Sequence, residues 1–153
     1  SNKTEKGKIK AVAAKDNIVI VNIKSSRMLM AYGFLRKVFE VFEQHKTPID
    51  MISTSEVAVS LTIDSTGHLD SIVTELKKFG NIDVEKNQTI ICVVGHNIGR
   101  QKGVLKKVFG ALADVPVKMV SCGGSNNNIS IVIEPSHKEK ALIALNEGLF
   151  GIQ

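Results

Sequence analysis

The sequence predicts an α+β fold made of two similar βαββαβ units, each an antiparallel sheet with helices packed on one face. Two observations predict it. Alternating apolar strands and amphipathic helices follow one another from Ile9 to about Asn146. The second half also repeats the first at an offset of about seventy residues, as Gly33–Phe39 (GFLRKVF) against Gly103–Phe109 (GVLKKVF) shows. Each unit is therefore expected to be a ferredoxin-like sandwich.

The chain opens with two predicted strands, Ile9–Lys15 and Ile18–Ile23, separated by a turn at Asp16-Asn17. The first helix is expected to start at Gly33 or Phe34 and to end near His45, because Pro48 cannot continue it. Its apolar residues form a broad stripe that is expected to pack on the sheet. The stripe consists of Phe34, Leu35, Val38, Phe39, Val41 and Phe42.

Later elements follow from the same periodicities. The first unit continues with strands at 49–55 and 57–63, a helix to about Phe79 and a strand from Ile82, which Gln88 separates from the next strand. The second unit is expected to contain a strand at 89–94, a helix at 102–113, strands at 117–122 and 129–133, and a helix at 135–146 that Gly148 ends.

The strand count predicts how the two units share the chain. The second unit has no room for a closing strand after its last helix, whereas a spare strand precedes the first unit. We expect that spare strand to complete the second sheet. The first domain would then be 17–87, and the second would combine 8–15 with 88–153.

Composition narrows the classes of function. No run of about 18 apolar residues and no apolar signal region occur, so we expect no membrane segment and a cytoplasmic location. The net charge of +5 comes from lysines mixed with acids, which is typical of a solvated surface rather than a nucleic-acid site. The polar start, Lys3–Lys8, resembles a cut linker, so we expect a fragment of a larger protein.

Catalytic and metal-binding signals are weak. The four histidines lack metal-ligand spacing, and no nucleophile–base arrangement is legible. The phenylalanines fall mainly on predicted helices, whereas RNA-binding domains of this fold carry aromatics on the sheet. Cys92 and Cys122 lie in apolar runs and are expected to be buried free thiols; a disulfide or a reactive thiol is the alternative.

One stretch of the first unit has the chemistry of an amino-acid site. A glycine turn at Gly33 followed by a helix start offers backbone N–H groups to a carboxylate. Asp50 and Glu56 are candidates to hold ammonium groups, and Thr54 and Ser55 add hydroxyls. The alternative is that both acids are solvated strand-end residues, and the pattern alone leaves the two interpretations open.

The second unit keeps the turn and the helix but not the acids. Lys118 replaces Asp50, and Gly123-Gly124 replace Ser55-Glu56. We therefore expect the second unit not to bind an amino acid in the same way. Its loop Gly123–Asn128 either binds something else or packs against a partner.

The segments Met28–Phe42, Ile49–Thr62 and Val120–Ser130 together resemble the regulatory region of aspartokinase, which contains two ACT domains. The resemblance covers nearly the whole chain from about Lys8, and the Gly-Phe-Leu and Thr-Ser-Glu-Val motifs in this order carry it. It implies an enzyme that phosphorylates the side-chain carboxylate of aspartate, the first step towards lysine, threonine and methionine. ATP and Mg would bind an N-terminal kinase domain that this chain lacks, so no catalytic residue, metal or cofactor is expected here.

The resemblance also implies feedback inhibition by an amino acid, with lysine as the first candidate and threonine as the second. The inhibitor would bind at the interface of a homodimer formed through the ACT domains. The site residues implied by matching motifs are Met28, Ala31, Gly33, Phe34, Leu35, Ile49, Asp50, Ser55 and Glu56. Ala31 and Pro48 each replace a serine of the lysine-sensitive pattern, which leaves the effector open. The alternatives are a structural dimerisation module with a vestigial site and a free-standing sensor, against which the polar start argues.

Overall fold

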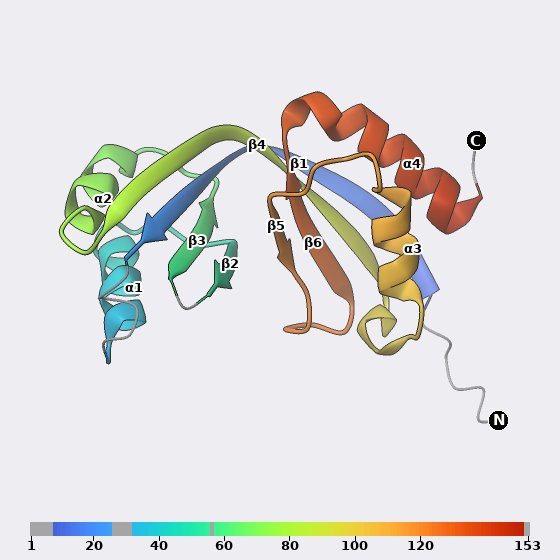
Figure 1. Cartoon of the computed structure of the whole chain (residues 1–153), viewed down its shortest axis with the longest axis horizontal. Helices are drawn as coiled ribbons and strands as arrows, with labels where there is room; N and C mark the ends of the chain where they lie inside the picture. The colour runs from blue at the N-terminus through green and yellow to red at the C-terminus, as the bar shows by residue number, and fades with distance from the viewer. Residues whose placement is uncertain (1–7, 26–31, 56, 152–153) are drawn as a thin grey trace. The chain divides into compact units, whose positions relative to one another are not determined.

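A computed structural model describes residues 8–25, 32–55 and 57–151 of the chain. Figure 1 shows its strands and helices. In chain order these are β1 (Lys8–Lys24), α1 (Phe34–Gln44), β2 (Met51–Thr54), β3 (Ala58–Ile63), α2 (Leu69–Leu76), β4 (Asn81–His96), η1 (Ile98–Arg100), α3 (Val104–Ala111), β5 (Met119–Ser121), β6 (Asn128–Ile133), η2 (Pro135–His137) and α4 (Lys138–Phe150).

The described residues form two compact units. We call residues 17–87 the first unit and residues 8–16 with 88–151 the second unit. The strand order is β2-β3-β1-β4-β6-β5, and the long strands β1 and β4 contribute residues to both units. Within each unit, two helices cover one face of the strands (Figure 1). The predicted α+β class with two repeated, antiparallel units is confirmed.

The two units repeat each other in register. In the first unit β1 pairs with β3 at Val19↔Ile63. In the second unit β4 pairs with β6 at Thr89↔Ile133, so each partner lies about seventy positions further along. The edge strands agree as well, because Met51 lies opposite Thr62 in one unit and Met119 lies opposite Val132 in the other. Residues about seventy positions apart therefore occupy the same place in the two units, and their side chains can be compared directly.

Helix α1 buries only part of its predicted apolar stripe. Phe34, Val38, Val41 and Phe42 are buried against the first unit's strands, but Leu35 and Phe39 are each 40% exposed. The expectation that the whole stripe packs on the sheet is wrong, because a stripe this broad is wider than one sheet covers. Two large apolar side chains thus remain on the flank of the helix.

Two predicted strand breaks are also wrong. The expected turn at Asp16-Asn17 lies inside β1, and the expected break at Gln88 lies inside β4. Asn17 has a φ of 60° and Asn87 a φ of 57°, both in the left-handed region. Asparagine tolerates this conformation, so a residue typical of turns distorts each strand locally without reversing the chain.

The end of α4 and the environment of Cys122 also differ from expectation. Gly148 does not end the last helix, which continues to Phe150 and is capped by Gly151 at a φ of 66°. A Cβ on Gly148 would lie 3.0 Å from Cβ of Ala111, so this glycine lets α4 pass close to α3. Cys122 is exposed and Cys92 half-buried, and both are free thiols. Burial of Cys122 was predicted wrongly because β5 ends at Ser121.

The N-terminal part of β1 is bound into the second unit. Ile9 and Val12 pack against that unit's core. The carboxylate of Asp16 accepts hydrogen bonds from Nζ of Lys138 at 2.6 Å and from Oγ1 of Thr89 at 3.0 Å. The hydrogen bond from Lys138, and secondarily that from Thr89, lowers the pKa of Asp16, although desolvation opposes the shift.

We predict that Asp16→Asn lowers the free energy of unfolding at pH 7. A carboxyl group with a lowered folded-state pKa stabilises the fold above its unfolded pKa, and this contribution disappears as the pH falls through the folded pKa. Urea unfolding of both proteins from pH 7 down to pH 3 should therefore show a difference that shrinks on acidification. A difference that is constant over this range would contradict the assigned role of the ionised carboxylate.

Gly80 provides a second test of the fold. A Cβ at this position would lie 2.6 Å from the backbone oxygen of Lys24, so Gly80→Ala must displace either the start of β4 or the end of β1. We expect a loss of about 1–3 kcal/mol in unfolding free energy. Gly67→Ala is the matched control, because a Cβ there meets nothing within 4 Å. Equal stabilities of the two variants in urea unfolding would argue against this close approach.

Candidate functional site

The start of α1 exposes backbone N–H groups. Its N-cap is Gly33, at φ 81° and ψ 7°, which has no side chain to cap the helix. A Cβ on Gly33 would meet nothing within 4 Å, so the backbone conformation requires glycine here and steric space does not. The first turn contains no acidic residue, and the positive end of the helix dipole can therefore attract an external anion such as a carboxylate.

The start of β2 positions a carboxylate. Asp50 is exposed, and its backbone N–H donates to the backbone oxygen of Thr62 at 2.8 Å. The next N–H, that of Met51, donates to the hydroxyl of Thr62 at 2.9 Å. Ile49 packs its side chain against the core of the first unit. Two consecutive amides at the base of Asp50 are thus held by one residue of β3.

The turn after β2 positions Ser55. Its backbone N–H donates to the oxygen of Ala58 at 2.9 Å, and its hydroxyl accepts a hydrogen bond from the N–H of Val57 at 3.4 Å. The side chain is exposed. Three other predicted site residues, Met28, Ala31 and Glu56, lie outside the described residues. The described part of the predicted site therefore consists of the α1 start, the β2 start and the turn that follows β2.

The strand topology places the β2 start far from the other two parts of the predicted site within one chain. Strands β1 and β2 both run antiparallel to β3, and the N–H of Ser25 donates to the oxygen of Val57 at 3.2 Å. The end of β1, which leads into α1, therefore lies at the same end of the sheet as Ser55. Asp50 lies at the other end of β2, roughly 13 Å away for a four-residue strand. A free amino acid is too short to contact both ends of one chain.

Three large apolar side chains on α1 and β2 are exposed. We call Leu35, Phe39 and Ile52 the α1–β2 surface; they are 40%, 40% and 36% exposed. Leu35 and Phe39 are one helical turn apart, and Ile52 lies opposite the core residue Leu61 and so faces the helix side of the sheet. Strand β2 is the last in the strand order and is paired only with β3 among the described strands. This edge is suited to contact another chain.

The second unit keeps the backbone of the site and changes its charge. Gly103 caps α3 at a φ of 84°, as Gly33 caps α1. The N–H of Lys118 donates to the oxygen of Val132 at 2.9 Å, as that of Asp50 does to Thr62. The ammonium group of Lys118 forms an ion pair with Glu134 at 2.5 Å. In the second unit, Lys118, ion-paired with Glu134, thus occupies the position that Asp50 has in the first unit.

The loop between β5 and β6 packs on its own unit. The oxygen of Asn126 accepts the N–H of Gly99 at 2.8 Å, and Oδ1 of Asn127 accepts the N–H of Asn97 at 3.0 Å. A Cβ on Gly99 would lie 3.0 Å from Cα of Asn126. Ile98, between these contacts, is 1% exposed. These contacts hold the loop against its own unit, and they test neither of the two predicted alternatives, binding of another ligand or packing against a partner.

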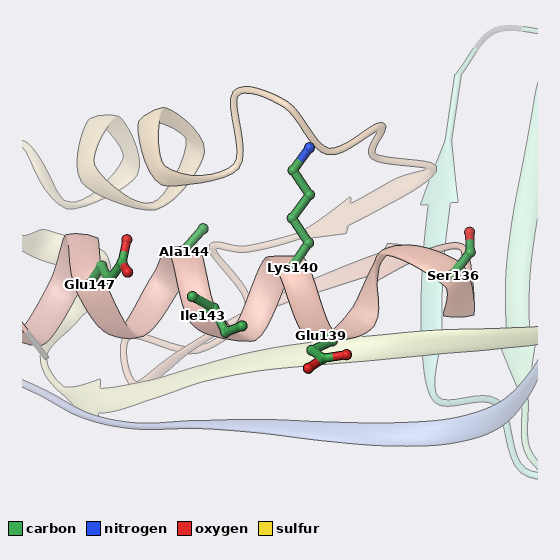
Figure 2. A pocket seen from close by; sticks show the side chains of 6 residues that line it. All are labelled: Ser136, Glu139, Lys140, Ile143, Ala144 and Glu147. Atoms are coloured by element: carbon green, nitrogen blue, oxygen red, sulfur yellow. The ribbon is translucent and has the colours of Figure 1, made fainter. Parts of the chain in front are cut away.

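One hollow of the surface lies away from these residues. It measures about 510 Å³ and borders only η2 and the outer side of α4 (Figure 2). Its lining residues are Ser136, Glu139, Lys140, Ile143, Ala144 and Glu147. Figure 2 shows Lys140 and Glu139 extending to different sides of the helix. The hollow includes no predicted site residue. A surface formed by one helix also does not enclose a ligand.

Two classes of site find no support in the part of the chain that the structure describes. No group of three or more His, Cys, Asp or Glu residues there could hold a metal ion. No helix among residues 8–25, 32–55 and 57–151 is long and apolar enough to cross a membrane.

Sequence reasoning missed Thr62. It is fully buried, at 0% exposed, and holds the backbone of Asp50 and Met51. The repeat contained the signal, because Thr62 aligns with Val132 and so places a hydroxyl where an apolar residue suffices for the sheet.

Comparison with known proteins matches the chain to ACT domains and to aspartokinases. An ACT domain family model matches residues 21–70 and 91–149. Aspartokinase 3, chloroplastic, from Arabidopsis thaliana is 34% identical over 98% of this chain, which spans 29% of that relative. The chain therefore corresponds to about a third or less of such a relative.

Solved structures agree with these matches. A structure assigned to the C-terminal regulatory domain of aspartate kinase from Porphyromonas gingivalis is 48% identical and has a TM-score of 0.84, covering 93% of this chain and 98% of that one. Escherichia coli aspartokinase III in complex with lysine and aspartate is 32% identical with a TM-score of 0.83, covering 97% of this chain and 35% of that one. The resemblance predicted from the motifs is confirmed.

Proposed function

Because the chain belongs to the ACT domain family and matches the regulatory region of aspartokinases throughout, we propose that it senses an end-product amino acid and transmits feedback inhibition to a kinase domain. The attached enzyme would transfer phosphate from ATP, with Mg, to the side-chain carboxylate of aspartate. Its catalytic residues would lie in the kinase domain. The 153-residue chain alone would therefore have no kinase activity.

The proposed effector site is built from two chains. Asp50 and the end of β1, which leads into α1, lie at opposite ends of β2, so one chain would not offer both parts of the site to one amino acid. A second copy paired antiparallel along β2 would bring Asp50 of the partner subunit beside the α1 start and Ser55. The α1–β2 surface supports this arrangement, since Leu35, Phe39 and Ile52 would be buried in the contact.

The chemistry of this site favours an amino acid with an additional ammonium group. The α1 N-terminus would bind the α-carboxylate, and the two acids that the sequence predicts for the site, Asp50 and Glu56, would each hold one ammonium group by a charge-assisted hydrogen bond. Lysine fits best, and the solved E. coli relative was crystallised with lysine. Threonine is the second choice, because Ala31 and Pro48 lack the hydroxyls of the lysine-sensitive pattern.

The observation that carries the proposal is the difference between two otherwise equivalent units. Both keep a left-handed glycine cap and the same hydrogen bond at the start of the edge strand. Only the first unit has an acid there, whereas Lys118 of the second is paired with Glu134. Binding would shift the kinase equilibrium only if the effector prefers one dimer arrangement, and roughly 1–3 kcal/mol of coupling suffices.

A second candidate function is dimerisation without sensing. The second unit also leaves apolar side chains exposed beside its edge strand, with Leu105 49% and Val120 36% exposed. Exposed apolar edges in both units favour an interaction module whether or not a ligand binds. Calorimetry separates the two functions, because only the sensor releases heat with an amino acid.

We predict that titrating lysine into the chain gives a saturable heat, larger than that from threonine or methionine. Asp50→Ala should weaken binding at least about tenfold, because one charge-assisted hydrogen bond contributes roughly 1.5–3 kcal/mol. Lys118→Ala, at the equivalent position of the second unit, is the matched control and should leave the affinity unchanged. Absence of heat with all three amino acids would favour the dimerisation module.

We also predict that Phe39→Glu with Ile52→Glu, neither of which is a predicted site residue, converts the dimer to a monomer in sedimentation velocity and removes the lysine heat. Both side chains are already partly exposed, so the fold should survive, as circular dichroism can check. Leu105→Glu in the second unit is the control and should retain lysine binding. Full lysine affinity in a monomeric double variant would refute the two-chain site.

A further inference from the structure

We propose that Thr62 is a positioning residue for the effector site: its buried hydroxyl holds the β2 start so that Asp50 points its carboxylate at the effector's ammonium group. This inference rests on the function proposed above. It concerns a residue of the central strand β3 that we do not expect to touch the effector.

The geometry shows one residue holding two amides. The backbone oxygen of Thr62 accepts the N–H of Asp50 at 2.8 Å, and its Oγ1 accepts the N–H of Met51 at 2.9 Å. A regular antiparallel ladder does not direct two successive N–H groups of one strand to one residue of its neighbour. The side-chain hydroxyl therefore serves as an additional acceptor at the first residue of β2.

The position of β2 makes this acceptor important. The strand has only four residues and is paired only with β3 among the described strands, so few bonds hold it. Met51 is 6% exposed and Thr62 is 0% exposed, so water cannot readily replace a missing hydroxyl. Without it, the β2 start and the attached Asp50 would sample more orientations.

The second unit offers an internal comparison. Val132 occupies the position of Thr62, opposite Met119, and its backbone oxygen still accepts the N–H of Lys118 at 2.9 Å. A valine side chain cannot accept a hydrogen bond, yet β5 pairs with β6 in the same register as β2 with β3. The hydroxyl is thus not required to build the strand pair, and it occurs in the unit whose edge strand carries the acid.

The test compares three single variants of the 153-residue chain by calorimetry with lysine. Thr62→Val should weaken lysine binding about tenfold, which corresponds to the loss of one buried hydrogen bond. Thr62→Ser keeps the hydroxyl and should stay within about twofold of the original affinity. Val132→Thr, the reverse change in the second unit, should leave the affinity unchanged.

A double-mutant cycle separates positioning from a merely structural role. If Thr62 acts through Asp50, adding Thr62→Val to Asp50→Asn should cause no further loss of affinity. Additive losses, or an unaltered affinity in Thr62→Val, would overturn the proposal. Circular dichroism melting of each variant checks that the fold persists; if Thr62→Val unfolds, the comparison of Thr62→Ala with Thr62→Ser replaces it.

Amide hydrogen exchange keeps this inference distinct from the proposed function. Thr62→Val should speed exchange at Met51 without ligand, whereas Val132→Thr should leave Met51 unchanged. If the original chain binds no amino acid but Met51 exchanges faster in Thr62→Val, the sensing function fails and the strand-holding part stands. Unchanged exchange at Met51 rejects that part as well.

Discussion

The rest of the structure depends on two strands that each serve both units. β1 and β4 continue through the unit boundary, and each takes up a left-handed asparagine there, at Asn17 and Asn87. Neither distortion reverses the chain, so each strand continues from one unit into the other. Residues 8–16 can therefore supply the second unit, where Asp16 is held by Lys138 and Thr89. With residues 8–16 included, the second unit has the same set of strands and α-helices as the first, and the interpretation of the site relies on this equivalence.

That equivalence turns one chain into a comparison of two related sites. The glycine caps, the first hydrogen bond of each edge strand and the strand registers are the same, and the side chains at 50 and 62 differ from those at 118 and 132. Charge and hydroxyl therefore change together while the backbone stays constant. Such a pattern is expected where one copy retains ligand chemistry and the other retains only the scaffold.

Periodicity predicted the fold class, because alternation and helical spacing are local signals that repeat here. It failed where tertiary contacts override local preference. Gly148 has the local signature of a helix end but serves close packing against Ala111, and Asn17 has that of a turn but lies within a strand. The site was only partly predictable for a similar reason. Gly33 and Asp50 are visible as motifs, whereas their separation along β2 and the role of Thr62 depend on strand pairing.

The interruption of the second unit by the first has a consequence for folding. The first unit is one continuous segment, so it can fold as soon as it leaves the ribosome. The second must bring residues 8–16 to strands that follow residue 88. Closing that long loop costs chain entropy, unless the intervening segment is already compact and brings its ends together. Early folding of the first unit would then bring the two segments of the second unit together. A mutation that slows folding of the first unit would therefore slow folding of the second as well.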